Sequence, residues 1–107
     1  MVTVPKDLYY YVGEKPPALP CRYEDDDGNL ITSISGKTLE AKVLIDRVDT
    51  AERTVSCSNN DDGTFTIDWG TTTSDFTGSG IMRVDILVTD SPRSWYMDRF
   101  TIEIRER

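Results

Sequence analysis

The sequence has 107 residues, which fits one domain with one hydrophobic core, and we expect a single domain over residues 1–107. It carries 19 acidic and 12 basic side chains, a formal net charge of -7, so phosphate backbones and anionic membrane surfaces are poor partners. Residues 1–6 are too short and too polar for a secretory leader, and no apolar run approaches membrane length, so we expect a protein made in the cytoplasm.

The first half of the chain predicts three strands. Residues 8–12 are aromatic and β-prone, and Gly13 ends this run. Apolar residues recur at every second position over residues 18–23, and the acidic turn at 25–29 follows. After a loop, apolar and charged residues alternate over residues 39–46, which indicates a strand with one buried and one exposed face.

The second half continues the alternation in four more strands. One ends at Cys57, and the turn at 59–63 joins it to a strand over residues 65–69 as a hairpin. Residues 82–88 form what we expect to be the longest strand, and residues 100–105 form the last. No segment has the spacing of an amphipathic helix, so we predict an all-β, antiparallel sandwich of about seven strands with Greek-key connections.

The residues that usually perform catalysis are scarce. The chain has no histidine, which excludes Ser–His and Cys–His nucleophile pairs, and Cys21 and Cys57 are too few for a zinc site. The acidic turns at 25–27 and 61–62 contain Asp before Gly, which is typical of β-turns, and both lack ligands that an EF-hand calcium loop needs. We predict no enzymatic activity, no cofactor and no metal. The two cysteines are either reduced core residues or a disulfide across the core.

Exposed aromatic side chains are the remaining candidate for function. If Tyr10 points inward, Tyr9 and Tyr11 lie on the opposite face, and a second aromatic group lies in or beside the last connection between strands. The alternative is that the second group caps the core and the tyrosines cover the sheet edge. The predicted partner interface consists of Tyr9, Tyr11, Arg93, Trp95, Tyr96 and Arg99.

Several motifs follow one another in a characteristic order: LYYYVG at residues 8–13, DDDGNL at 25–30, DGTFTIDW at 62–69 and SDFTG at 74–78. Together with the Leu19–Pro20 strand, this order resembles the immunoglobulin-like N-terminal domain of BppU-type phage upper-baseplate proteins over nearly the whole chain. The segment 90–94 replaces the usual Asp-Gly hairpin. We expect the chain to differ from that family in lacking the long C-terminal part that carries receptor-binding proteins.

The resemblance implies a non-enzymatic virion structural protein with an immunoglobulin-like β-sandwich. Its expected partners are tail, baseplate, connector or major capsid proteins and copies of itself, with no nucleic acid and no membrane. Its expected location is the virion, after synthesis in the host cytoplasm. The alternative is a carbohydrate- or cell-surface-binding module in which Trp95 and Tyr96 stack on sugar rings. A third hypothesis is an enzyme that uses Asp61 or Asp75.

Overall fold

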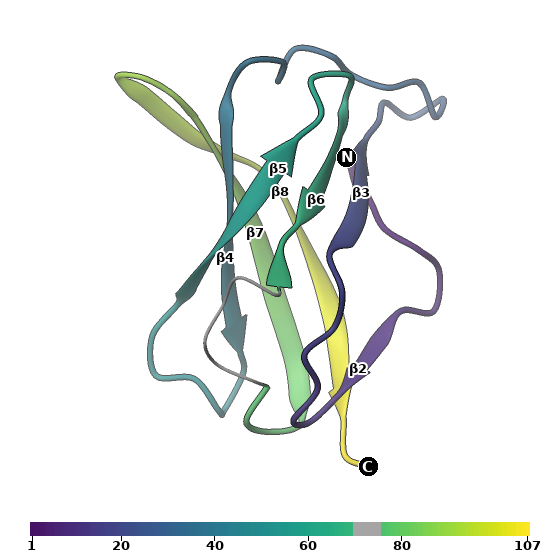
Figure 1. Cartoon of the computed structure of the whole chain (residues 1–107), viewed down its shortest axis with the longest axis vertical. Helices are drawn as coiled ribbons and strands as arrows, with labels where there is room; N and C mark the ends of the chain where they lie inside the picture. The colour runs from purple at the N-terminus through teal and green to yellow at the C-terminus, as the bar shows by residue number, and fades with distance from the viewer. Residues whose placement is uncertain (70–75) are drawn as a thin grey trace.

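The protein is all-β. A computed structural model describes residues 1–69 and 76–107 (Figure 1). Among these residues no α-helix occurs, and no helix is long and apolar enough to cross a membrane. Ser74 and Asp75, which belong to the fourth resemblance motif, lie outside the described residues. The strands are β1 (Val2–Thr3), β2 (Tyr9–Tyr11), β3 (Leu19–Tyr23), β4 (Thr38–Ile45), β5 (Arg53–Asn59), β6 (Thr64–Ile67), β7 (Gly80–Asp90) and β8 (Arg93–Arg105).

All eight strands belong to one curled sheet with the order β1-β3-β6-β5-β4-β7-β8-β2. Every neighbouring pair is antiparallel except β2 and β8, which run parallel. Strand β5 pairs with β6 on one side and with β4 on the other, so it joins two halves of the sheet. The curl brings the buried faces of both halves onto one core, with β3 and β6 in front of β7 and β8 (Figure 1).

The core follows the predicted alternation. In β4 and β7 every second side chain is buried and the residues between them are half-buried or exposed, because successive side chains of a strand point to opposite faces. Hydrophobic burial of this kind is the main driving force for folding. The buried residues are Leu39, Ala41, Val43 and Ile45 in β4, and Met82, Val84, Ile86 and Val88 in β7.

The N-terminal segment contributes two strands, whereas the sequence predicted one at residues 8–12. Strand β1 pairs antiparallel with β3, and β2 then pairs parallel with β8, so the chain crosses from one half of the sheet to the other. Between them, Pro5 lacks the N–H that a strand ladder needs, and Asp7 has a positive φ of 58°. Strand β1 was missed because two residues are too few to show alternation.

The β7–β8 hairpin is longer than predicted, and its two strands extend to a loop of only Ser91 and Pro92, joined by a cis peptide bond. Strand β8, with 13 residues, is the longest, so the expectation that residues 82–88 form the longest strand is wrong. Trp95 and Tyr96, which the sequence placed in or beside the connection, lie inside β8 and pair with residues of β7. Aromatic residues are favoured in strands. In Figure 1 this hairpin projects beyond the body at the upper left.

Candidate functional site

The six residues predicted as an interface lie in two separate regions, near opposite ends of β8. Tyr9 and Tyr11 lie on β2, where Tyr9 is beside Glu103 near the C-terminal end of β8. Trp95 lies eight residues earlier in β8, in the projecting hairpin. A strand rises about 3.3 Å per residue, so the two aromatic groups are about 26 Å apart. One compact partner site therefore cannot include both groups.

At the β2 end, the alternation of exposed and buried tyrosines is as predicted. Tyr10 is only 5% exposed, its ring stacks on Phe76, and its hydroxyl accepts a hydrogen bond from Nε1 of Trp69 at 3.0 Å. Burial raises the pKa of Tyr10 to about 12. Tyr9 and Tyr11 are each 37% exposed, and their rings meet edge-to-face with centroids 5.4 Å apart.

Arg105 belongs to the β2 surface, although the sequence interpretation did not include it. Its guanidinium carbon lies 3.8 Å from the centroid of the Tyr9 ring, which is cation–π geometry. The side chain reaches this position because β8 pairs with β2 and places Arg105 opposite Tyr11. This parallel pairing joins residues far apart in the chain, so no local pattern in the sequence signals it.

At the other end, a β-bulge decides which way the aromatic residues face. The β7–β8 register shifts between Ile86 and Leu87, which leaves Met97 as one extra residue in β8. Tyr96 is opposite Leu87, whose side chain is on the outer face, and Trp95 is opposite the buried Val88 on the core side. The bulge sets which of the two faces the core, and because neighbouring residues of a strand point to opposite faces, Trp95 and Tyr96 do not form a joint aromatic platform.

Tyr96 and Arg99 share the outer face of the hairpin. Tyr96 is 57% exposed. Arg99 binds Asp85 of β7 with two contacts, Nε to Oδ1 at 2.6 Å and Nη2 to Oδ2 at 3.1 Å, and this bonding raises the pKa of Arg99. Asp85, Tyr96 and Arg99 line a shallow hollow together with Glu52 of the β4–β5 loop.

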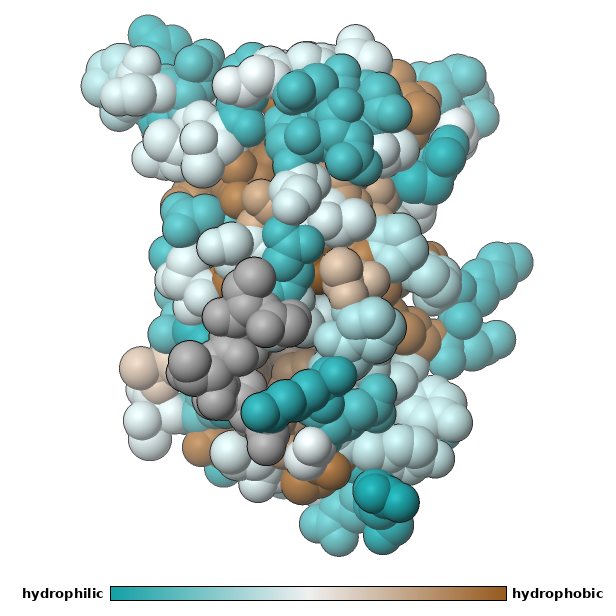
Figure 2. Space-filling view, viewed as in Figure 1, coloured by the Kyte–Doolittle hydropathy of each residue, from teal (hydrophilic) through white to brown (hydrophobic). Residues whose placement is uncertain are grey.

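Trp95 and Arg93 lie on the core-side face of the hairpin, but beyond most of the core. Trp95 keeps 42% of its surface exposed, so its ring covers the core only in part. Arg93 is exposed opposite Asp90 at the tip. On the face of the molecule seen in Figure 2, apolar residues appear only in small areas between polar ones, so no broad apolar groove opens there. The exposed aromatic residues of the projecting hairpin are therefore a more distinctive candidate for a partner site than this face of the molecule.

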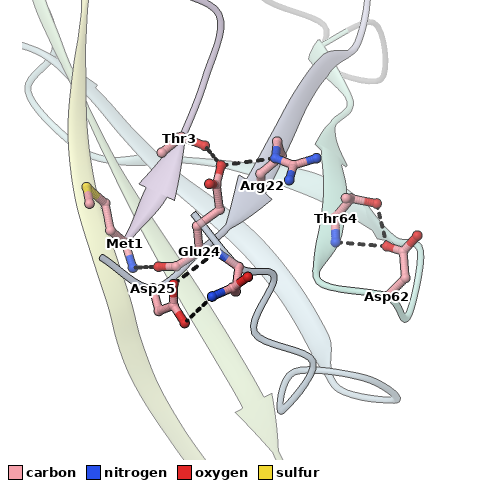
Figure 3. A network of polar contacts seen from close by, with 8 residues as sticks. Met1, Thr3, Arg22, Glu24, Asp25, Asp62 and Thr64 are labelled. Carbon is pink, nitrogen blue, oxygen red and sulfur yellow. Dashed lines mark hydrogen bonds and ion pairs between the residues drawn. The ribbon is translucent and has the colours of Figure 1, made fainter. Parts of the chain in front are cut away.

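The acidic turns use their carboxylates locally (Figure 3). Asp25 accepts the backbone N–H groups of Asp27 and Asn29, both at 2.9 Å, and Asp62 accepts the N–H of Thr64 at 2.9 Å. These bonds lower the pKa values of Asp25 and Asp62 and hold both ionised, whereas a general acid needs a raised pKa. In the described ranges, no three or more His, Cys, Asp or Glu side chains gather in a way that could hold a metal.

The cysteines are free thiols. Cys21 on β3 is opposite Phe65 and Cys57 on β5 is opposite Ile67, so the two cysteines flank β6 within one half of the sheet and do not face each other across the core. Two strand spacings are about 10 Å, which is beyond the reach of a disulfide. Burial raises the pKa of each thiol to about 12, so neither is an activated nucleophile at neutral pH.

No protein-family model matches the sequence, and none of the curated proteins compared with it is significantly similar. The functional argument therefore depends on the two aromatic surfaces and on the fold that displays them.

Proposed function

We propose that the chain is a non-enzymatic structural protein of a phage virion, an immunoglobulin-like module that docks onto tail, baseplate, connector or capsid proteins. The observation that carries the proposal is the projecting β7–β8 hairpin, which exposes Trp95 on one face and Tyr96 with Arg99 on the other. Trp, Tyr and Arg dominate the energetic centres of protein interfaces. The β7–β8 ladder already holds their backbone in an extended conformation, so little backbone entropy is lost on binding.

The strand order supports the immunoglobulin-like assignment. The order β1-β3-β6-β5 corresponds to strands A-B-E-D of that fold, and β4-β7-β8 corresponds to strands C-F-G. One departure is the continuous pairing of β5 with β4, which joins the two halves. Another is the position of the cysteines, because Cys21 and Cys57 fall on the strands equivalent to B and D, whereas antibody domains bridge B and F.

The chemistry of the polar groups supports a structural role. The chain has no histidine, and the carboxylates of both acidic turns bind their own backbone. The net charge of -7 favours a partner with a basic surface, which would be attracted at long range. Many copies on one particle would strengthen a weak contact by multivalency.

Mass spectrometry of purified particles from the phage or prophage that encodes the chain tests the virion assignment. The chain should co-purify with particles through a density gradient, in a fixed ratio to the major structural proteins. Its absence from intact particles, with abundant chain free in the lysate, would refute the assignment.

The alternative is a carbohydrate-binding module, which the exposed aromatic rings favour in a general way. Sugar rings usually stack on an accessible aromatic face, but Trp95 and Tyr96 point to opposite faces, and Tyr9 and Tyr11 stand at 84° to each other. A glycan panel probed with the isolated chain separates the two functions. Specific glycan binding that Trp95→Ala abolishes would favour the alternative.

A further inference from the structure

The outer edge of β8 is open along the projecting hairpin. In the order of the sheet, β8 lies between β7 and β2, and β2 pairs only with Glu103 to Arg105. Further up the strand, the carboxylate of Asp98 closes the edge by accepting the backbone N–H groups of Val2 and Arg99. An unpaired stretch from Arg93 to Met97 remains in the described part of the chain.

The direction of the backbone groups on this stretch follows from the hairpin. A two-residue loop makes Asp90 and Arg93 a hydrogen-bonded pair, so Arg93 and Trp95 direct their N–H and C=O groups toward β7. Ser94 and Tyr96 therefore direct theirs outward. An exposed edge with free donors and acceptors is a template for another strand.

We propose that this edge pairs antiparallel with the same edge of a second copy of the chain, about a two-fold axis at Trp95. In this register Ser94 is opposite Tyr96 of the second copy, and Arg93 is opposite Met97. The open stretch is then paired over its whole length, because Trp95 is its central residue. The surface is self-complementary, as a two-fold contact between copies requires.

The side chains fit this pairing. Trp95 meets Trp95 of the second copy at a position without hydrogen bonds, where opposite side chains approach most closely. Arg93 comes beside Asp98 of the second copy, and the symmetry repeats this attraction. Residues 93–97 contain no acidic residue, although the chain has a net charge of -7, so this edge avoids repulsion between carboxylates. The two copies of Arg93 lie about 13 Å apart, so their mutual repulsion is weak. The projecting arms also keep the two acidic bodies apart.

The pairing of copies rests on the proposed function, because it names one neighbour of the hairpin in the assembly. The pairing and the virion role can nevertheless fail separately. A chain that stays monomeric yet binds particles would overturn the pairing of copies alone. A chain that pairs in solution yet is missing from particles would overturn the virion role alone.

Sedimentation equilibrium and amide hydrogen exchange test the pairing. The small contact predicts a monomer–dimer equilibrium with a dissociation constant on the order of 100 µM. The amides of Ser94 and Tyr96 should gain protection as concentration rises. The amide of Trp95, which bonds to β7, should be protected at every concentration. A monomer up to about 1 mM with no such gain would refute the pairing.

Ser94 offers a matched pair of variants. Ser94→Pro removes an N–H that faces solvent in the monomer, so the β7–β8 ladder stays intact while the partner strand loses two bonds by symmetry. We expect dimerisation to weaken about tenfold or more, with an unchanged circular dichroism spectrum. Ser94→Ala keeps the N–H and should dimerise like the natural chain. Equal dimerisation of Ser94→Pro and Ser94→Ala would refute the edge contact.

Cysteine cross-linking tests the register. Trp95→Cys places a thiol on the two-fold axis, within disulfide distance of its symmetry mate, whereas Arg93→Cys places it about 13 Å from its own. Under mild oxidation Trp95→Cys should form a covalent dimer much faster than Arg93→Cys. Cys21 is buried and Cys57 is half-buried, and both thiols have a raised pKa, so they should not compete. Equal rates would contradict the register.

Discussion

Strand β7 contains two isoleucines with opposite environments. Ile86 is fully buried against the core, and Ile81 on the outer face is 46% exposed. Truncation of Ile to Ala removes three carbon groups, worth about 0.8 kcal/mol each when buried, or about 2.4 kcal/mol in total. The cavity left at Ile86 adds to this, so Ile86→Ala should lower the free energy of unfolding by about 3–4 kcal/mol. Ile81→Ala loses about half the transfer contribution and leaves no cavity, which predicts about 1 kcal/mol.

Urea unfolding followed by tryptophan fluorescence measures both variants. The midpoint should fall strongly for Ile86→Ala and slightly for Ile81→Ala, with the same slope of free energy against urea as the natural chain. Because residue type and strand are the same, the difference reports only which face of β7 packs on the core. Equal losses, or a larger loss for Ile81→Ala, would refute the assignment of faces.

Three further predictions concern a turn, a hydrogen-bonded carboxylate and the thiols. Gly63 has a φ of 90°, and a Cβ there would lie 3.0 Å from the carbonyl oxygen of Ile31. Gly63→Ala should therefore lower the free energy of unfolding by about 1–3 kcal/mol, seen as a lower melting midpoint in calorimetry. An unchanged midpoint would contradict the strain at this position. Hydrogen bonds, the largest from Thr3, lower the pKa of Glu24 below its usual 4.5. The contribution of Glu24 to stability is therefore present above pH 4.5 and lost as the pH falls through its pKa in the folded state. In an acid titration, Glu24→Gln should lose less stability than the natural chain, and identical curves would contradict this prediction. Burial raises the pKa of the Cys21 and Cys57 thiols to about 12, so both should react with a thiol reagent at about pH 8 much more slowly in the folded chain than in urea. Equal rates in the folded and unfolded chain would contradict the raised pKa values.

The sequence predicted the strands whose whole length alternates between a buried and an exposed face, because that pattern is local. Strands β4 and β7 are the clearest examples, since each keeps a strict period of two. The first part of β8 was placed in a connection because Met97 interrupts the alternation and the residues before it are mostly exposed. A bulge depends on how two strands pair, so neighbouring residues in the sequence do not reveal it.

The candidate site shows the same limit. The sequence identified the exposed aromatic residues of β2 and β8 from their type and spacing, and their exposure agrees with that. It did not show that the two groups lie at opposite ends of β8, because that depends on the parallel pairing of β2 with residues more than ninety positions later in the chain. Which of Trp95 and Tyr96 lies on the core side likewise depends on the register with β7.

The most direct measurement is the binding of fluorescently labelled chain to phage particles that lack it. If the hairpin is the docking element, the double variant Trp95→Ala/Tyr96→Ala should bind at least about tenfold more weakly than the natural chain. The matched control Tyr9→Ala/Tyr11→Ala, at the other end of β8, should bind nearly as well. Full binding by the hairpin variant, with loss of binding by the control, would contradict the account.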